Sequence, residues 1–202
     1  AHMGQVPIHP DFLHQLRDVT EKSNVVFIMD EVVTGFRASP GGAQARYGVT
    51  PDICSLAKIL AGGMPGGAVA GKAEIIDTIE SGDIAHPGTF NANPISAAAG
   101  STALGILATE PVNAKADAAA ERLRRGLDDV FARLEIPGHT YGQASMVHTR
   151  IGVSAETDEY GIIQGDMIGE PISDEADHEL ALAMFNNGID SHRRFLMAMT
   201  HT

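Results

Sequence analysis

The sequence predicts an α/β fold followed by a smaller α+β part. Short apolar runs alternate with helical patterns over the first half of the chain, and two of the runs end at a charged residue, Asp30 and Lys58. Continuous apolar runs are typical of strands that are buried on both faces, as in parallel sheets. Because the composition changes near residue 110, we expect two domains, residues 1–110 and 111–202.

Strand and helix patterns follow each other closely in the first part. The apolar runs cover residues 25–29, 53–57 and 68–70. A helical pattern over "HPDFLHQLRDVTEKSN" precedes the first run, and another over "KAEIIDTIESG" follows the third. An alanine-rich helix then begins near Pro94, which the first turn of a helix accepts, and its small side chains permit close packing. This alternation favours an α/β architecture.

The second part has a different composition. We expect a long charged amphipathic helix over residues 112–134, a strand at 145–152 and then a polar loop. A helix over "DEADHELALAMFNNG" ends at Gly188, and an apolar strand follows at 195–199. These patterns predict a small α+β domain.

Composition excludes several function classes. Lys and Arg number 14 and Asp and Glu 26, so the formal net charge is −12, the wrong sign for a nucleic-acid-binding surface. The single cysteine, Cys54, cannot form an internal disulfide and lies in an apolar run, which fits a reducing compartment. No apolar stretch reaches the ~18 residues of a membrane span, and no signal-peptide pattern opens the chain. We therefore expect a cytoplasmic protein with no nucleic-acid or membrane partner.

Three common kinds of site fit the sequence poorly. "GGAVAGKA" has the spacing of a phosphate-binding loop, but Ala73 stands where a magnesium-binding hydroxyl is required. The nine histidines form no pair with a metal-ligand spacing, so no metal site is expected. A nucleophilic serine motif is absent, and Cys54 lies within a predicted strand.

Asp30 and Lys58 form a more informative pair. Each ends an apolar strand, so both are expected at one edge of the sheet. A partly desolvated lysine can form a Schiff base with the aldehyde pyridoxal 5′-phosphate (PLP), and Asp30 would keep the cofactor's ring nitrogen protonated. On spacing alone an alternative stays open, in which Asp30 and Glu31 begin a solvated loop and Lys58 is an ordinary surface lysine.

Further residues complete a hypothetical PLP site. Val32 lies two positions after Asp30, on the same face of an extended segment, where it would pack against the cofactor ring. Gly88 and Thr89, in "PGTFNANP", precede a helix and would supply backbone N–H groups and a hydroxyl to the phosphate.

Several motifs, in order, resemble those of class-III aminotransferases. They are "MDEVVTGFR", "GGAQARYGVTPDICSLAKILAGGMPGGAVAG" and "HPGTFNANPISAAAG", and they cover most of residues 1–110, with a looser similarity through "GIDSHRRFLMAMTHT". The similarity is strongest to the branch that includes glutamate-1-semialdehyde 2,1-aminomutase. It implies a fold type I PLP-transferase large domain, with a mixed, mostly parallel sheet and flanking helices, plus a small C-terminal domain.

The resemblance also implies residue roles and partners. It makes Lys58 the Schiff-base lysine, Asp30 the partner of the ring nitrogen and Val32 the ring-packing residue, while Thr89 binds the phosphate in the neighbouring subunit's site. A homodimer with its sites at the interface is therefore expected. The family's N-terminal glycine-rich phosphate loop and stacked aromatic residue are not in this chain, so we expect it to be the C-terminal half of a longer enzyme and inactive alone.

The reaction itself is left between alternatives. "GTFNAN" differs from the Gly-Thr-Leu-x-Gly pattern associated with the mutases, which favours a transaminase that passes an amino group to a keto or aldehyde acceptor. The aminomutase reaction and a non-catalytic remnant of the fold stay open. The candidates for binding a substrate carboxylate are Arg37, Arg150, Arg193 and Arg194.

Overall fold

Two compact units make up the chain. The computed structural model describes residues 6–158, 161–190 and 194–201. The N-terminal unit spans Pro10–Val112, and the C-terminal unit spans Asn113–Thr202 together with Ala1–His9. We propose that these units correspond to the two domains expected from the sequence.

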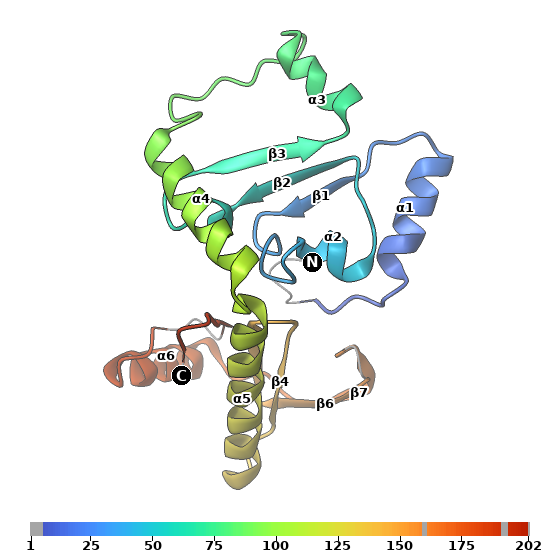
Figure 1. Cartoon of the computed structure of the whole chain (residues 1–202). Helices are drawn as coiled ribbons and strands as arrows, with labels where there is room; N and C mark the ends of the chain where they lie inside the picture. Colours follow the sequence, from blue (N-terminus) through green and yellow to red (C-terminus); the bar gives the residue numbers. More distant parts are fainter. Residues whose placement is uncertain (1–5, 159–160, 191–193, 202) are drawn as a thin grey trace. The chain divides into compact units, whose positions relative to one another are not determined.

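A three-stranded mixed sheet forms the centre of the N-terminal unit. Strand β1 (Ile28–Glu31) pairs in parallel with β2 (Ile53–Ala57), and β2 pairs antiparallel with β3 (Gly67–Gly71). Figure 1 shows β1 and β2 running in one direction and β3 in the other. The predicted α/β class is confirmed, although the first apolar run becomes a strand only from Ile28.

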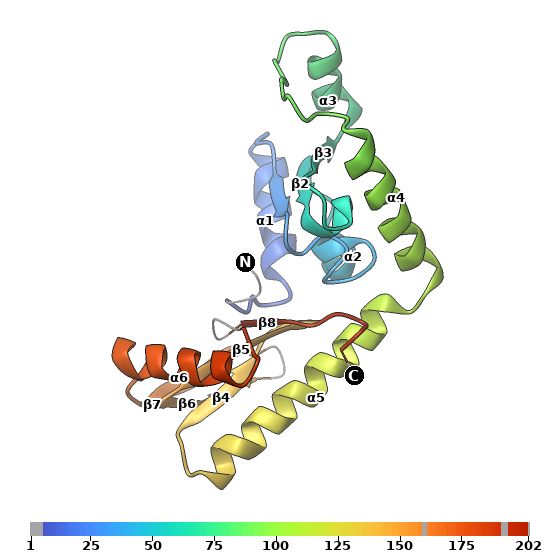
Figure 2. The ribbon, with the colours of Figure 1, turned by 90° about the vertical axis from the view of Figure 1, so that its left-hand side faces the viewer.

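Helices flank this sheet on two sides, and in Figure 2 the strands are seen between α1 and α4. The helices are α1 (Phe12–Lys22), α2 (Gly42–Tyr47), α3 (Ala73–Glu80) and α4 (Pro94–Thr109). Helix α4 has proline at its first position, as expected, and Asn93 caps it by accepting hydrogen bonds from the Ile95 and Ser96 amides. The short helix α2 was not expected, because its six residues are too few for a clear helical pattern.

Asp52 joins three elements at the amino end of β2. Its carboxylate accepts hydrogen bonds from Lys72 Nζ at 2.8 Å, the Phe27 amide at 2.7 Å and Arg17 Nη1 at 2.9 Å. These contacts, led by the one from Lys72, hold the pKa of Asp52 well below its usual range and raise the pKa of Lys72. The lysine of "GGAVAGKA" is therefore an ion-pair partner, and the residues before it form a strand and not a phosphate loop.

A one-turn 3-10 helix, η2 (Lys58–Ala61), follows β2 and packs on α4. Gly100 is buried in α4, and a Cβ atom there would press on the Leu60 carbonyl oxygen. Gly62 ends the turn with φ +60°, and its own Cβ would lie 2.5 Å from the Ala99 carbonyl oxygen. Small residues in α4 therefore allow η2 to pack closely against this helix. This packing holds the turn that begins with Lys58 in place.

The C-terminal unit combines helices with antiparallel sheets. Its elements are α5 (Val112–Arg133), β4 (Gly138–Tyr141), β5 (Met146–Ile151), β6 (Val153–Thr157), β7 (Ile163–Gly169), α6 (Asp174–Asn186) and β8 (Arg194–Leu196). Strands β4, β5 and β8 form one sheet, and β6 and β7 form a hairpin. The expected polar loop after residue 152 was therefore wrong. Neither β6 nor β7 has a continuous apolar run, so the sequence pattern did not indicate strands there. The core centres on Met146 and Val147, which are almost fully buried.

Candidate functional site

The carboxyl ends of β1 and β2 bring Asp30 next to Ser55. The two residues are partners in the parallel register, so their side chains lie on the same face of the sheet. Ser55 Oγ donates a hydrogen bond to Asp30 Oδ1 at 3.3 Å. Exposure alternates along β1, with Asp30 exposed and Met29 and Glu31 buried. Asp30 is therefore open to a ligand on the exposed face.

The Val32 amide also donates to Asp30 Oδ1, at 2.9 Å. Such a bond from an Asp side chain to the amide two residues on is an Asx-turn, and it sets the orientation of the carboxylate. Both donors reach Oδ1, and within the described chain Oδ2 accepts no hydrogen bond. One carboxylate oxygen is thus free for an external donor.

Val32 itself lies in a turn and not in an extended segment, because β1 ends at Glu31. Its side chain is half-buried. The alternation of side chains along β1 ends at Glu31, one residue before Val32, so it does not place Val32 on the same face as Asp30. The packing of Val32 against a cofactor ring stays a prediction.

Lys58 begins the η2 turn directly after the last residue of β2. Its φ of +53° lies in the left-handed region, which costs a non-glycine residue free energy and is often found at functional sites. The side chain is exposed and forms no ion pair or hydrogen bond with any of the described residues. Its amine is therefore available for a ligand at the same end of the sheet as Asp30.

Gly88 and Thr89 lie in an exposed loop just before α4. The Asn91 amide donates to the Gly88 carbonyl at 3.0 Å, and Asn91 Nδ2 donates to the His86 carbonyl at 3.0 Å. A Cβ at position 88 would lie 2.7 Å from Asn91 Cγ, so the Asn91 side chain packs closely over this glycine. The predicted location of Gly88 and Thr89 is thus found, whereas their binding of a phosphate stays a prediction.

Two backbone amides at the N-terminus of α4 already have a hydrogen-bond acceptor within the chain, the side chain of Asn93. Asn93 Oδ1 accepts from the Ile95 amide at 3.0 Å and from the Ser96 amide at 3.2 Å. A phosphate at this loop would therefore not bind those two amides. Among the described residues no hydrogen bond involves the Thr89 hydroxyl, which leaves it free to donate to a ligand.

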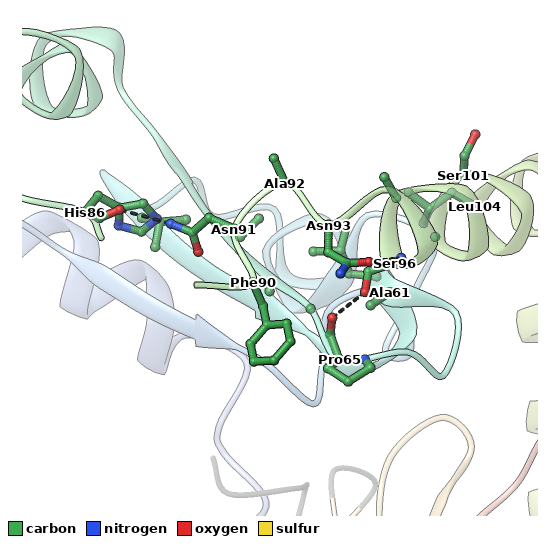
Figure 3. A pocket seen from close by; sticks show the side chains of 17 residues that line it. Ala61, Pro65, His86, Phe90, Asn91, Ala92, Asn93, Ser96, Ser101 and Leu104 are labelled. Atoms are coloured by element: carbon green, nitrogen blue, oxygen red, sulfur yellow. Dashed lines mark hydrogen bonds between the residues drawn. The ribbon is translucent and has the colours of Figure 1, made fainter. Parts of the chain in front are cut away.

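A pocket of about 820 Å³ lies between this loop, η2, β3 and α4 (Figure 3). Its lining includes Leu60 and Ala61, which follow Lys58, and Phe90, which follows Thr89. Across it Ser96 Oγ donates to the Pro65 carbonyl at 2.6 Å. None of the five predicted site residues lines the pocket, so it borders the lysine turn and the threonine loop without containing them.

Sequence reasoning missed Ser55 and misjudged Glu31. Ser55 carries the single hydroxyl in the apolar run "ICSLA", and this is the only local feature that indicates a role for it. Glu31 is completely buried, with 0% of its side chain exposed, so the alternative of a solvated loop beginning at both carboxylates is wrong for this residue.

The candidate arginines are distributed over both units. Arg37 lies half-buried in the loop after β1. Arg150 is exposed, with its guanidinium 5.7 Å from the centre of the Tyr141 ring, and Arg194 is half-buried in β8. Arg193 lies outside the described residues. The structure therefore selects none of them as a substrate ligand.

Two kinds of feature are absent from the described part of the chain. It contains no group of three or more His, Cys, Asp or Glu side chains arranged to hold a metal ion. It also contains no helix with the length and apolar character needed to cross a bilayer.

Comparison with known proteins identifies relatives of the whole N-terminal unit. A family profile described as "Aminotransferase class-III" matches residues 1–157. A glutamate-1-semialdehyde 2,1-aminomutase from Methanococcoides burtonii is 46% identical over 153 residues, which make up 75% of this chain and 36% of the relative. A protein of the same name from Sulfolobus acidocaldarius is 48% identical over 120 residues, 59% of this chain and 29% of the relative.

Solved structures agree on the fold. An omega-transaminase from Sphaerobacter thermophilus superposes with a TM-score of 0.77 at 28% identity, over 98% of this chain and 45% of that one. A structure described as a transaminase with PLP bound superposes with a TM-score of 0.67 at 25% identity, over 91% of this chain and 48% of that one. This chain spans about a third of the length of the curated relatives it matches. As its motifs predict, it belongs to the class-III aminotransferases, a family of PLP-dependent enzymes.

Proposed function

We propose that this chain forms part of a PLP-dependent transaminase in which Lys58 carries the cofactor and Asp30 binds its ring nitrogen. One observation carries the proposal. The partnerless amine of Lys58, held in a left-handed turn, is at the same end of the sheet as an Asp30 carboxylate with one free oxygen. A surface lysine that only solubilises the protein needs no strained backbone.

The other predicted residues have matching roles. Val32 packs against the ring, and Gly88 and Thr89 contribute a turn and a hydroxyl for the phosphate. The occupied α4 N-terminus means that Thr89 would bind the phosphate without help from the amides of Ile95 and Ser96. The roles of Val32 and Thr89 follow from the family motifs, and that of Gly88 follows from its place in a turn before α4.

Bound PLP supplies an electron sink for the carbanion left when a proton leaves the substrate Cα. Asp30 would hold the ring nitrogen through its free Oδ2 and would keep that nitrogen protonated. Lys58 would hold the cofactor, and its Nζ would take and return the substrate proton as general base and acid.

A glutamate-1-semialdehyde 2,1-aminomutase is the second candidate. Relatives with that name are 40–48% identical to this chain, which favours it, whereas "GTFNAN" favours the transaminase. The two reactions are separated by incubation of the enzyme with glutamate 1-semialdehyde and no second acceptor. An aminomutase converts it into an isomer of the same mass, and a transaminase requires an added amine donor and a keto or aldehyde acceptor.

Activity further requires protein beyond these residues. The chain spans about a third of its relatives' length, and apolar side chains around β1 are exposed, with Ile28 at 60% and Val26 at 51%. We propose that an N-terminal half covers them and that two copies form a homodimer with the site at their interface. The buried free Cys54 favours a cytoplasmic location.

The decisive experiment uses the full enzyme, including the proposed N-terminal half. The PLP-treated enzyme is reduced with borohydride and analysed by peptide mass spectrometry. We expect the cofactor to be attached to the peptide containing Lys58, and no attachment in Lys58→Ala. Lys22→Ala, which removes another exposed lysine, should retain it. A cofactor attached to another lysine, or a protein that stays colourless, as a non-catalytic remnant would, contradicts the proposal.

A further inference from the structure

The carboxylate next to Asp30 is buried on the opposite face of the sheet. Glu31 is the last residue of β1, and successive strand side chains point to opposite faces. Asp30 therefore faces the exposed side, while Glu31, with no exposed surface, lies beneath the strand. The two residues share a peptide unit, so a shift of the backbone at Glu31 also shifts the backbone that carries Asp30.

Glu31 forms hydrogen bonds with residues at both the start and the end of the loop that follows β1. Its Oε2 accepts from the Ala43 amide at 3.0 Å and from the Thr34 hydroxyl, and Oε1 accepts from the Gln44 amide at 2.8 Å. The Gly35 amide donates to the Glu31 carbonyl oxygen at 2.8 Å. This one residue thus bonds to both ends of the segment that contains Val32 and Arg37.

The space around the carboxylate admits no larger neighbour. A Cβ at Gly42, where φ is +74°, would lie 2.8 Å from Oε1 and 2.9 Å from Oε2. A Cβ at Gly35 would lie 2.6 Å from the Glu31 carbonyl oxygen. Backbone amides only donate, so both side-chain oxygens must accept, and glutamine offers one acceptor where glutamate offers two.

We propose that Glu31 is a positioning residue for the cofactor site, which holds the end of β1 so that Asp30 presents its free oxygen to the cofactor ring nitrogen. The inference rests on the proposed function. Glu31 acts through Asp30 and through the Val32 amide, which is bonded to Asp30 Oδ1. It touches neither substrate nor cofactor, because it has no exposed surface.

The test compares Glu31→Gln with Asp52→Asn in the full PLP-loaded enzyme. Asp52 is a matched control, because it is a buried carboxylate with a backbone amide donor at the other end of the same sheet. Both variants should lower the stability of the cofactor-free protein. Only Glu31→Gln should raise the Kd for PLP, roughly tenfold or more by analogy with residues that orient metal ligands. It should also shift the pH midpoint of the cofactor absorbance, because a less well-placed Asp30 holds the ring proton less tightly.

A second pair keeps the test independent of whether Glu31→Gln folds. Gly42→Ala pushes on the carboxylate of Glu31 and should reproduce the loss of PLP affinity. Gly48→Ala carries similar backbone strain, with φ +66°, but nothing lies within 4 Å of its Cβ, and it should retain the wild-type Kd.

The outcomes separate the two claims. If the wild type binds PLP and both Glu31→Gln and Gly42→Ala keep its Kd and its pH midpoint, Glu31 is only structural and this inference is overturned. If the wild-type enzyme takes up no PLP, the proposed function fails, and the positioning role of Glu31 fails with it.

Discussion

Asp30 and Ser55 lie opposite each other at the carboxyl end of the β1–β2 pair, and Ser55 Oγ donates to Asp30 Oδ1 at 3.3 Å. With the Val32 amide on the same oxygen, this contact leaves Oδ2 without a hydrogen-bond donor among the described residues. The Ser55 contact is a product of strand register, because a shift of one residue would place Cys54 or Leu56 opposite Asp30. The Val32 contact is local and belongs to the Asx-turn.

Ser55→Ala should weaken PLP binding by about three- to tenfold, because a net ~0.5–1.5 kcal/mol hydrogen bond that orients Asp30 is lost. A Kd measured by absorbance titration of the full enzyme checks this. Thr102→Ala removes a hydroxyl that bonds only within its own helix and should leave the Kd unchanged. Equal Kd values for Ser55→Ala and the wild type would show that Ser55 does not orient Asp30.

Lys58→Gly should stabilise the cofactor-free protein while it abolishes covalent PLP attachment. Glycine adopts positive φ freely, so relief of the strain at position 58 is worth about 1 kcal/mol or more. Lys58→Ala also prevents attachment but keeps the strain, and is the matched control. Urea unfolding measures the stability of both variants. A glycine variant that is no more stable than the alanine variant would argue against strain at this turn.

Gly100→Ala should destabilise the N-terminal unit by roughly 1–3 kcal/mol, because its Cβ would press on the Leu60 carbonyl oxygen and separate η2 from α4. Gly105→Ala, in the same helix with nothing within 4 Å, should instead stabilise by up to about 1 kcal/mol, since alanine favours helices. Chemical denaturation distinguishes them. If both substitutions stabilise, the close packing of the lysine turn on α4 is wrong.

Asp52 should make the stability of the protein sensitive to acid. Its folded pKa lies below the unfolded value of 3.8, so the unfolded state binds more protons and stability rises with pH. The contribution is complete above about pH 5, decreases as pH falls below the unfolded pKa, and is lost only when pH falls through the folded pKa.

Urea unfolding of the wild type and of Asp52→Asn over this range measures the effect. The difference in stability between the two proteins should shrink as the pH falls toward about 3. A difference that is the same at neutral and acidic pH would mean that Asp52 is not the titrating group.

Local patterns in the sequence determined the elements on which the site depends. The apolar runs that end at Asp30 and Lys58 became β1 and β2, and the helix starting at Pro94 became α4. These features depend on the side-chain period and on turn residues, which a short window of sequence contains. The family motifs lie in those same segments.

The tertiary structure alone decided which side chains meet. Ser55 reaches Asp30 through strand register, and Glu31 is buried because α2 closes over it from twelve residues away. The hairpin of β6 and β7 also forms where the sequence shows no apolar run. Contacts between segments distant along the chain depend on how the elements pack and on which buried polar groups can find partners, and no local pattern contains that information.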